Sequence, residues 1–237
     1  MAREYMGHIL LDRLEEKVLP PQRTALLIVD MQNDFVHDDG VCGKAFGTAM
    51  LEGFQAVIEP IRRLADAARR AGVPVFYSMV TQLPDGSLAS PVWLADNLRY
   101  GFEPIQCMRG TWGHRIIDQL TPQPGDIAFE KTRRSCFQGT GFENLLRARD
   151  VRSIVTVGVA ASGCVESTVR DAIEKDFFVI VAQDAIGNNT PAMTEACLPT
   201  FKALLAPEDL TTTERLISIW SASAPHSQRS AEAAGQS

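Results

Sequence analysis

The chain has 237 residues, of which 45% are hydrophobic and 22% charged, values typical of a globular protein rather than a disordered or fibrous one. Its 23 basic and 29 acidic side chains give a net charge of −6, which argues against a protein that binds nucleic acid. No apolar run approaches the roughly 18 residues that a membrane span needs, and no secretory signal is visible at the N-terminus. We therefore expect a cytoplasmic protein with neither nucleic-acid nor membrane partners.

The two ends of the chain differ in composition from its middle. Residues 1–22 are polar and end in Pro20-Pro21, which predicts an extension that lies on the body or on a partner. Residues 221–237 are rich in alanine, serine and glutamine and poor in large apolar side chains, so we expect a disordered tail. Residues 23–220 contain no internal repeat and no long linker, which predicts a single domain.

The domain alternates apolar strands with helical stretches. Its first strand, 25–29, is a continuous aliphatic run, typical of a strand buried on both faces. Further strands are expected at 73–80, 126–130, 151–158, 177–182 and at the start of 209–219, and helices at 54–71, 115–120, 142–149, 163–175, 191–205 and at the end of 209–219. This alternation predicts a three-layer α/β fold, Rossmann-like, with helices on both faces of a mostly parallel, roughly six-stranded sheet.

Three reactive groups of different kinds follow the predicted strands. Asp30 follows the first strand, Lys131 the third, and Cys164 the fourth, through a turn flanked by Gly158 and Gly163. Ligands of parallel sheets bind outside the carboxyl ends of the strands, so we expect the three groups to meet at one edge.

Cys164 is the expected nucleophile of this group. A helix N-terminus and a nearby lysine favour thiolate over thiol, and N–H groups of the turn can face a developing oxyanion. None of the four histidines is an obvious base, so Asp30 is expected to take the thiol proton while Lys131 holds the two charged groups together. The alternative is a structural cysteine, a loop-start aspartate and a solvated lysine; the other four cysteines are expected to be small buried hydrophobes.

The segments 26–35, 130–131 and 158–165 resemble the isochorismatase-like cysteine hydrolase superfamily, and the resemblance extends over roughly residues 22–220. It implies a catalytic triad of Asp30, Lys131 and Cys164, the residues reached above from the strand ends. It also implies a cis peptide bond between Val159 and Ala160 that aims the amides of Ala160 and Cys164 into an oxyanion hole. The family further suggests a homodimer or homotetramer and no cofactor.

Two departures from the family pattern bear on the reaction. The stretch 77–84 has none of the histidines that hold a metal in the nicotinamidase branch, so no metal is expected. Vinyl-ether-cleaving isochorismatases commonly lack the nucleophilic cysteine, which is present here. The stretches 109–113, 120–126 and 164–171 are most similar to the ureide-cleaving branch, although Glu166 and Arg170 also form a plain i, i+4 pair.

The resemblance thus implies a cysteine amidohydrolase that cleaves a C–N bond of a small amide or ureide through a thioester-type intermediate. A vinyl-ether hydrolase and a catalytically inactive binding subunit are the alternatives.

Four side chains are candidates for contact with the substrate. Asn33 and Phe35 follow Asp30 closely, although Phe35 is about as well explained as core. Arg109 and Trp112 belong to a long proline- and glycine-rich excursion, residues 81–113, where a lid or specificity loop is expected. An arginine there can anchor a substrate carboxylate by a bidentate pair.

Overall fold

A computed structural model of the protein describes residues 3–99 and 105–223. Its main sheet has six parallel strands in the order β5-β4-β3-β6-β7-β8. The strands are β3 (Thr24–Val29), β4 (Val75–Val80), β5 (Ile127–Lys131), β6 (Ser153–Val159), β7 (Phe178–Gly187) and β8 (Leu210–Thr211). The predicted α/β class and the six-stranded parallel sheet are confirmed.

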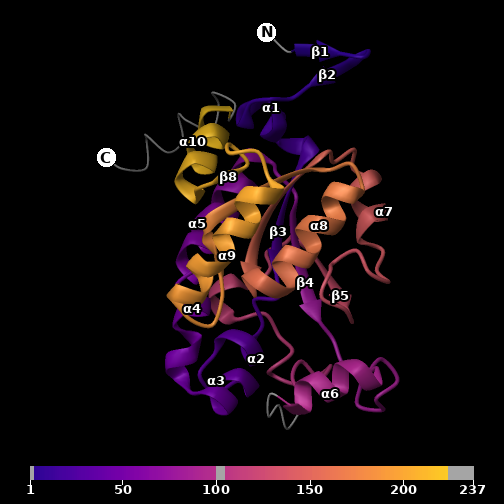
Figure 1. Ribbon diagram of the computed structural model, residues 1–237, viewed down its shortest axis with the longest axis vertical. Coiled ribbons are helices and arrows are strands. Elements are labelled where there is room, and N and C mark those ends of the chain that lie inside the picture. The colour runs from indigo at the N-terminus through magenta and orange to yellow at the C-terminus, as the bar shows by residue number, and fades with distance from the viewer. Residues whose placement is uncertain (1–2, 100–104, 224–237) are drawn as a thin grey trace.

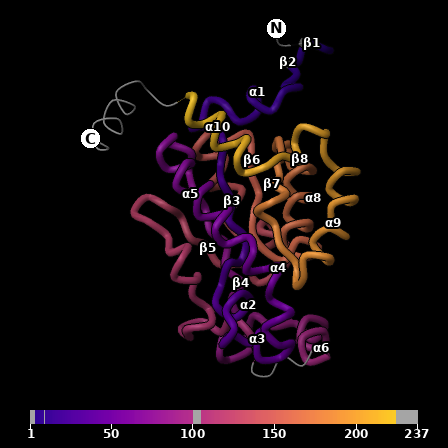
Figure 2. Tube along the Cα trace, turned by 90° about the vertical axis from the view of Figure 1, so that its left-hand side faces the viewer, coloured from indigo at the N-terminus to yellow at the C-terminus, as the bar shows by residue number. Residues whose placement is uncertain are grey.

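Helices cover both faces of this sheet, as Figure 2 shows with α5 on one side and α8 and α9 on the other. The helices are α1 (Leu14–Val18), α2 (Asn33–Val36), α3 (Val41–Phe46), α4 (Glu52–Gln55), α5 (Ile58–Ala71), α6 (Pro91–Arg99), α7 (Phe142–Arg147), α8 (Glu166–Glu174), α9 (Pro191–Leu204) and α10 (Thr213–Ser223). In Figure 1, α2, α3 and α6 lie together at the end of the molecule where β3 and β4 lead out of the sheet.

The apolar run of β3 is explained by its position in the middle of the sheet. Leu26 and Ile28 point into the core beneath α5 and α10, whereas Ala25, Leu27 and Val29 point into the core beneath α7, α8 and α9. All six residues of β3 are buried. A strand with two covered faces has no position for a polar side chain until it ends.

Several element boundaries differ from the sequence-based expectation. The predicted helix 54–71 is divided into α4 and α5, and Pro60 falls in the first turn of α5, where a missing N–H costs little. The predicted helix 115–120 is only a 3₁₀ turn, Asp118–Leu120. β7 continues beyond its predicted end to Gly187, because Ile186 and Gly187 still pair with β6, and the polar Asp184 within this stretch accepts hydrogen bonds from the backbone N–H and the hydroxyl of Thr213.

The N-terminal segment has two parts. β1 (Arg3–Tyr5) and β2 (His8–Leu10) form an antiparallel hairpin at the opposite end of the molecule from α6 (Figure 1). Helix α1, in contrast, buries Leu14 and Val18 in the core, and Lys17 forms a buried ion pair with Asp209 at 2.6 Å. The predicted extension therefore packs onto the body from α1 onward.

At the other end, α10 extends to Ser223, past the predicted domain boundary at 220. The predicted tail lies outside the described residues from position 224 on. Within the described ranges, each helix is too short or too polar to cross a lipid bilayer.

Candidate active site

Asp30 and Lys131 form an ion pair inside the protein. Asp30 follows β3 directly, Lys131 is the last residue of β5, and Nζ lies 2.8 Å from Oδ2 with side-chain exposures of 0% for the lysine and 1% for the aspartate. Strand β4 lies between β3 and β5, so the lysine reaches across it. Ser78 on β4 donates its hydroxyl hydrogen to Oδ1 of Asp30 at 2.7 Å. Oδ1 of Asp30 therefore accepts from the serine hydroxyl, and Oδ2 forms the ion pair with the lysine ammonium.

The ammonium of Lys131 has hydrogen-bond partners besides the carboxylate of Asp30. Nζ also donates to the backbone carbonyl oxygens of Arg133 and Arg134, at 3.0 and 2.8 Å. Burial by itself lowers the pKa of Lys131, but the Asp30 carboxylate more than offsets this, and the pKa is raised above its ordinary value. Lys131 is therefore a fixed positive charge at neutral pH.

Cys164 reaches the same edge through the turn after β6. Gly158 has a φ of +110°, and a Cβ at this position would stand 2.2 Å from the carbonyl oxygen of Val29. Only glycine allows β6 to lie so close to β3 where Asp30 leaves the sheet. The Val159–Ala160 peptide bond is cis, as the family resemblance implied.

A π-helical turn, Ala161–Val165, carries Cys164 and continues into α8. The predicted helix 163–175 thus begins two residues early, and the cysteine lies within its first turn.

The prediction of a thiol poised as thiolate is wrong for the resting protein. Burial raises the pKa of Cys164 to about 12; Lys131 lowers it, but Asp30 opposes the lysine. The lysine and the helix N-terminus both favour the thiolate, but the cost of removing a thiolate from water is larger. The thiol is consequently neutral at physiological pH, with the Asp30 carboxylate beside it.

Thr168 ties the backbone of the cysteine to a neighbouring loop. Its Oγ1 donates to the carbonyl oxygen of Cys164 at 2.7 Å and accepts from the backbone N–H of Cys136 at 3.1 Å. Sequence analysis assigned no role to Thr168 or to Ser78. The only available signals were a threonine four residues after the cysteine on a helix and a serine in an otherwise apolar strand.

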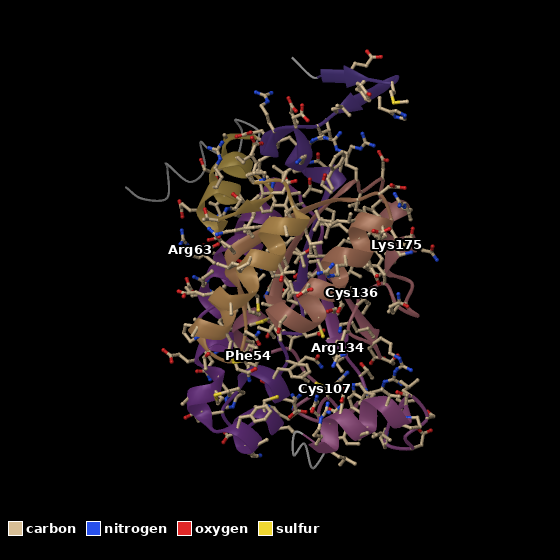
Figure 3. All side chains as sticks on the ribbon, in the orientation of Figure 1. Phe54, Arg63, Cys107, Arg134, Cys136 and Lys175 are labelled. Carbon is tan, nitrogen blue, oxygen red and sulfur yellow. The ribbon has the colours of Figure 1, made fainter. Side chains whose placement is uncertain are left out.

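Cys164 opens into a cavity of about 170 Å³. The lining residues come from six separate stretches of the chain and are Phe35, Val80, Trp93, Asp96, Asn97, Gln106, Thr132, Arg133, Arg134 and Cys164. Figure 3 shows Arg134 between the end of the sheet and α6. Helix α6, which belongs to the excursion 81–113, supplies one wall of the cavity, and Phe35 lines it as well.

The other three predicted substrate contacts are engaged elsewhere. The Asn33 amide donates to the carbonyl oxygen of Trp112 at 2.8 Å, and the exposed Arg109 pairs with Glu130. Trp112 lines a separate, larger cavity of about 510 Å³ between α3 and residues 105–113. The arginines at the Cys164 cavity are instead Arg133 and Arg134, which follow Lys131 directly.

Polar residues after Asp30 organise the surrounding loops rather than the reaction. The side-chain amide of Gln32 donates to the carbonyl oxygens of Val80 and His114, and its oxygen accepts from the backbone N–H of Val80. Asp34 accepts from the backbone N–H groups of Cys107 and Val41, at 2.6 and 3.2 Å. These contacts fix the excursion 81–113 to the end of β3, a role that sequence analysis missed.

One smaller expectation concerns a pair of charged side chains on α8. Arg170 and Glu166 form the expected i, i+4 ion pair at 2.9 Å on α8. Within residues 3–99 and 105–223, no group of three or more histidine, cysteine, aspartate or glutamate side chains is arranged to hold a metal ion.

A parallel sheet with a thiol, a carboxylate and an ammonium at its carboxyl edge suits a hydrolase that works through a cysteine, and comparisons with known proteins agree. Residues 24–214 match the isochorismatase domain family. The ureidoacrylate amidohydrolase RutB of Agrobacterium fabrum is 38% identical over 183 residues, which cover 73% of this chain and 79% of the relative.

Solved structures give the same result. A cysteine hydrolase from Pseudomonas syringae pv. phaseolicola has a TM-score of 0.74 and 27% identity, covering 86% of this chain and 95% of the other. The N-carbamoylsarcosine amidase of Thermoplasma acidophilum has a TM-score of 0.62 and 26% identity, covering 81% and 96%. The chain belongs to the isochorismatase family. It is a hydrolase of the amidohydrolase class, and the prediction of an enzyme acting on non-peptide C–N bonds is confirmed.

Proposed function

We propose that this amidohydrolase cleaves a C–N bond of a small ureide, with Cys164 as nucleophile, Asp30 as proton acceptor and donor, and Lys131 as a fixed counter-charge. The observation that carries the proposal is the buried ion pair of Lys131 and Asp30, 2.8 Å apart, beside a neutral thiol that opens into a cavity. An ion pair buried on all sides is costly to maintain, and in a cleft it is characteristic of a functional site.

The reaction begins when Sγ of Cys164 attacks the substrate carbonyl carbon while Asp30 accepts the thiol proton. The backbone amides of Ala160 and Cys164 donate to the oxygen that becomes negative. Asp30 then returns the proton to the leaving nitrogen, the C–N bond breaks, and ammonia or an amine departs. An amide leaves a thioester on the enzyme and a ureide leaves a thiocarbamate.

The second half of the reaction regenerates the enzyme. Asp30 accepts a proton from water as the water oxygen attacks the same carbon, and the C–S bond breaks with return of that proton to sulfur. Lys131 stays protonated throughout and stabilises the carboxylate and the departing sulfur, since its hydrogens are held by Asp30 and two backbone carbonyl groups.

The size and charge of the cavity support a small acidic ureide as substrate. A water molecule occupies about 30 Å³ of liquid, so a cavity of about 170 Å³ admits only a small molecule. Arg133 and Arg134 at its wall suit a substrate that carries a carboxylate. The relatives named for ureidoacrylate and N-carbamoylsarcosine, both N-carbamoyl acids, support the same class.

Substitution of Cys164 tests the proposed nucleophile. Cys164→Ala is expected to lower turnover of a ureide by several orders of magnitude, measured as ammonia release, whereas Cys42→Ala on α3 leaves it unchanged. Intact-mass spectrometry of the unsubstituted enzyme during turnover is expected to show an adduct on Cys164. Near-normal ammonia release by Cys164→Ala would reject the proposed nucleophile. Activity on a vinyl ether that remains intact after iodoacetamide has alkylated Cys164 would instead favour vinyl-ether hydrolysis without covalent catalysis. A protein that binds ureides but turns over nothing would be the inactive binding subunit.

We also propose that the enzyme assembles as a homodimer or homotetramer. The support is the family and the exposed apolar side chains Val92 and Leu98 on α6, with exposures of 77% and 51%. Light scattering after size-exclusion chromatography measures the mass directly, and a mass of 26.0 kDa, that of one chain, contradicts the proposal.

A further inference from the structure

The turn that carries Cys164 has one polar side chain besides the thiol, that of Ser162. Its backbone folds back on itself, and the N–H groups of Gly163 and Val165 both donate to the carbonyl oxygen of Ala160, at 2.9 and 3.3 Å. π-Helical turns of this kind are rare and occur mostly at functional sites. Contacts from outside the turn therefore matter for its conformation.

Asn188 holds the hydroxyl of Ser162 from the neighbouring strand. The residue follows β7 directly and is 4% exposed, and its Nδ2 donates to Oγ of Ser162 at 2.8 Å. Nδ2 also donates to Sγ of Cys197 on α9 at 3.4 Å, and Oδ1 accepts from the N–H of Asn189 at 3.1 Å. Because both ends of the amide are engaged, its orientation is fixed, with one N–H directed at the turn.

The backbone of Asn188 is anchored to two helices. Its N–H donates to Oγ1 of Thr194 on α9 at 2.8 Å. On the other side, a Cβ at Gly53 of α4 would stand 2.2 Å from the carbonyl oxygen of Asn188, so the two backbones are in direct contact. The N–H of Gly53 donates to the carbonyl oxygen of Asn189 at 3.1 Å. Figure 1 shows α4 beside the end of α9.

The contact joins two chain segments that separate at the edge of the sheet. Val159 of β6 lies opposite Gly187 of β7, and the two strands diverge after this pair. β6 leads into the turn of Cys164, and β7 leads into the segment of Asn188. The hydrogen bond from Asn188 to Ser162 connects the two segments again beyond the sheet.

We propose that the side-chain amide of Asn188, through the hydroxyl of Ser162, fixes the turn that presents Sγ and the backbone N–H of Cys164 to the substrate. Asn188 is thus a positioning residue. This inference rests on the proposed function, in which the N–H groups of Cys164 and Ala160 donate to the developing oxyanion. Ser162 precedes Cys164 by two residues, so a displaced Ser162 moves that N–H, and a misplacement of about 1 Å slows a reaction substantially.

Ser162→Ala removes the acceptor with little other change, because Ser162 is exposed. We expect kcat for N-carbamoyl-β-alanine to fall about tenfold and KM to change by no more than about twofold, measured as ammonia release. Ser162→Thr keeps the hydroxyl and is expected to retain kcat. Ser221→Ala, at an exposed serine of α10, is the matched control.

The background Asn188→Ala separates this contact from the other bonds of the asparagine. There the donor is already lost, so Ser162→Ala is expected to lower kcat by no more than about twofold further. A further tenfold loss in that background would overturn the proposal. Unchanged kcat in Ser162→Ala, a rise in KM alone, or a tenfold loss in Ser162→Thr would overturn it as well.

Hydrogen exchange supplies a readout that does not depend on turnover. In the full chain without substrate, Ser162→Ala and Asn188→Ala are each expected to speed exchange of the backbone amides in residues 160–165 and to leave β3 unchanged. Unchanged exchange in residues 160–165 would overturn the proposal. Faster exchange throughout the domain would also overturn it and reduce Asn188 to a residue of general stability. If the unsubstituted enzyme hydrolyses no ureide, the proposed function fails for this class, and the exchange comparison still decides whether Asn188 fixes the turn.

Discussion

The hydroxyl of Ser78 donates to Oδ1 of Asp30 at 2.7 Å, across the boundary between β4 and β3. Lys131 occupies the other carboxylate oxygen, so the serine fixes how the carboxylate is rotated about its side-chain bond. A proton acceptor in a buried site needs such a fixed orientation, because a misplacement of about 1 Å is enough to slow a reaction substantially. In the proposed reaction, Ser78 is thus a positioning residue that acts through Asp30.

Ser78→Ala is expected to lower kcat about tenfold with little change in KM, because the variant leaves Oδ1 of Asp30 without its hydrogen bond. Steady-state kinetics with a ureide substrate measures the effect. Ser153→Ala is the matched control, since Ser153 is also a fully buried serine of the same sheet, on β6, and donates to the carbonyl oxygen of Lys17. An equal loss of kcat in both variants would show that general destabilisation, and not orientation, is responsible.

Lys131→Met is expected to destabilise the protein by about 3–5 kcal/mol, because it leaves the carboxylate of Asp30 buried without a counter-charge. Urea denaturation followed by circular dichroism measures the free energy of unfolding. The double variant Asp30→Asn with Lys131→Met removes both charges and is expected to recover most of that loss. If the double variant is as unstable as the single one, the pair is not the source of the effect.

The raised pKa of Cys164, about 12, predicts an unusual pH dependence of alkylation. As long as the pH stays below the pKa, each increase of one pH unit raises the thiolate fraction about tenfold. The rate of iodoacetamide labelling is therefore expected to rise steadily from pH 7 to pH 10. An ordinary cysteine levels off near its pKa of about 8.5. Mass spectrometry of the peptide that contains Cys164 separates its reaction from that of the other four cysteines.

The variant Asp30→Asn tests whether Asp30 raises the pKa of the Cys164 thiol. Asp30 raises the pKa of the Cys164 thiol, so its neutral replacement is expected to lower that pKa and to speed alkylation about tenfold at a given pH. The same variant has lost the proton acceptor and is expected to be inactive on ureides. Slower alkylation of Asp30→Asn would mean that the carboxylate does not oppose thiolate formation.

The positions of the strands along the chain and their parallel direction were predictable from the sequence, because a buried parallel strand tolerates no polar side chain until it ends and helices separate the strands. The ends of those strands carry Asp30, Lys131 and Cys164, and the structure brings the three together. The state of the thiol was not predictable, because it depends on how much water three separate segments exclude. The extent to which water is excluded from the site cannot be inferred from the spacing of residues along the sequence.

The cavity wall was predicted only in part for a related reason. The excursion 81–113 was recognisable from its prolines and glycines, and helix α6 within it lines the cavity of Cys164. Which side chains turn inward depends on contacts between distant segments, such as that of Asp34 with the backbone of Cys107. Arg109 therefore looked like a substrate anchor in the sequence, although it lies on the surface against Glu130.

The N-terminal segment offers a test of the proposed domain boundary. Lys17 on α1 is buried against Asp209, and burial raises the pKa of Asp209 although the lysine opposes that rise. Lys17→Met is expected to lower the free energy of unfolding by about 3 kcal/mol, since it leaves the buried carboxyl group of Asp209 without its ion-pair partner. Deletion of residues 1–12, which takes away the hairpin but spares α1, is expected to change that free energy by less than about 0.5 kcal/mol. Urea titration of the two variants decides where the folded unit begins: a large loss on deletion of the hairpin would place it at β1, and a negligible loss in Lys17→Met would place it after α1.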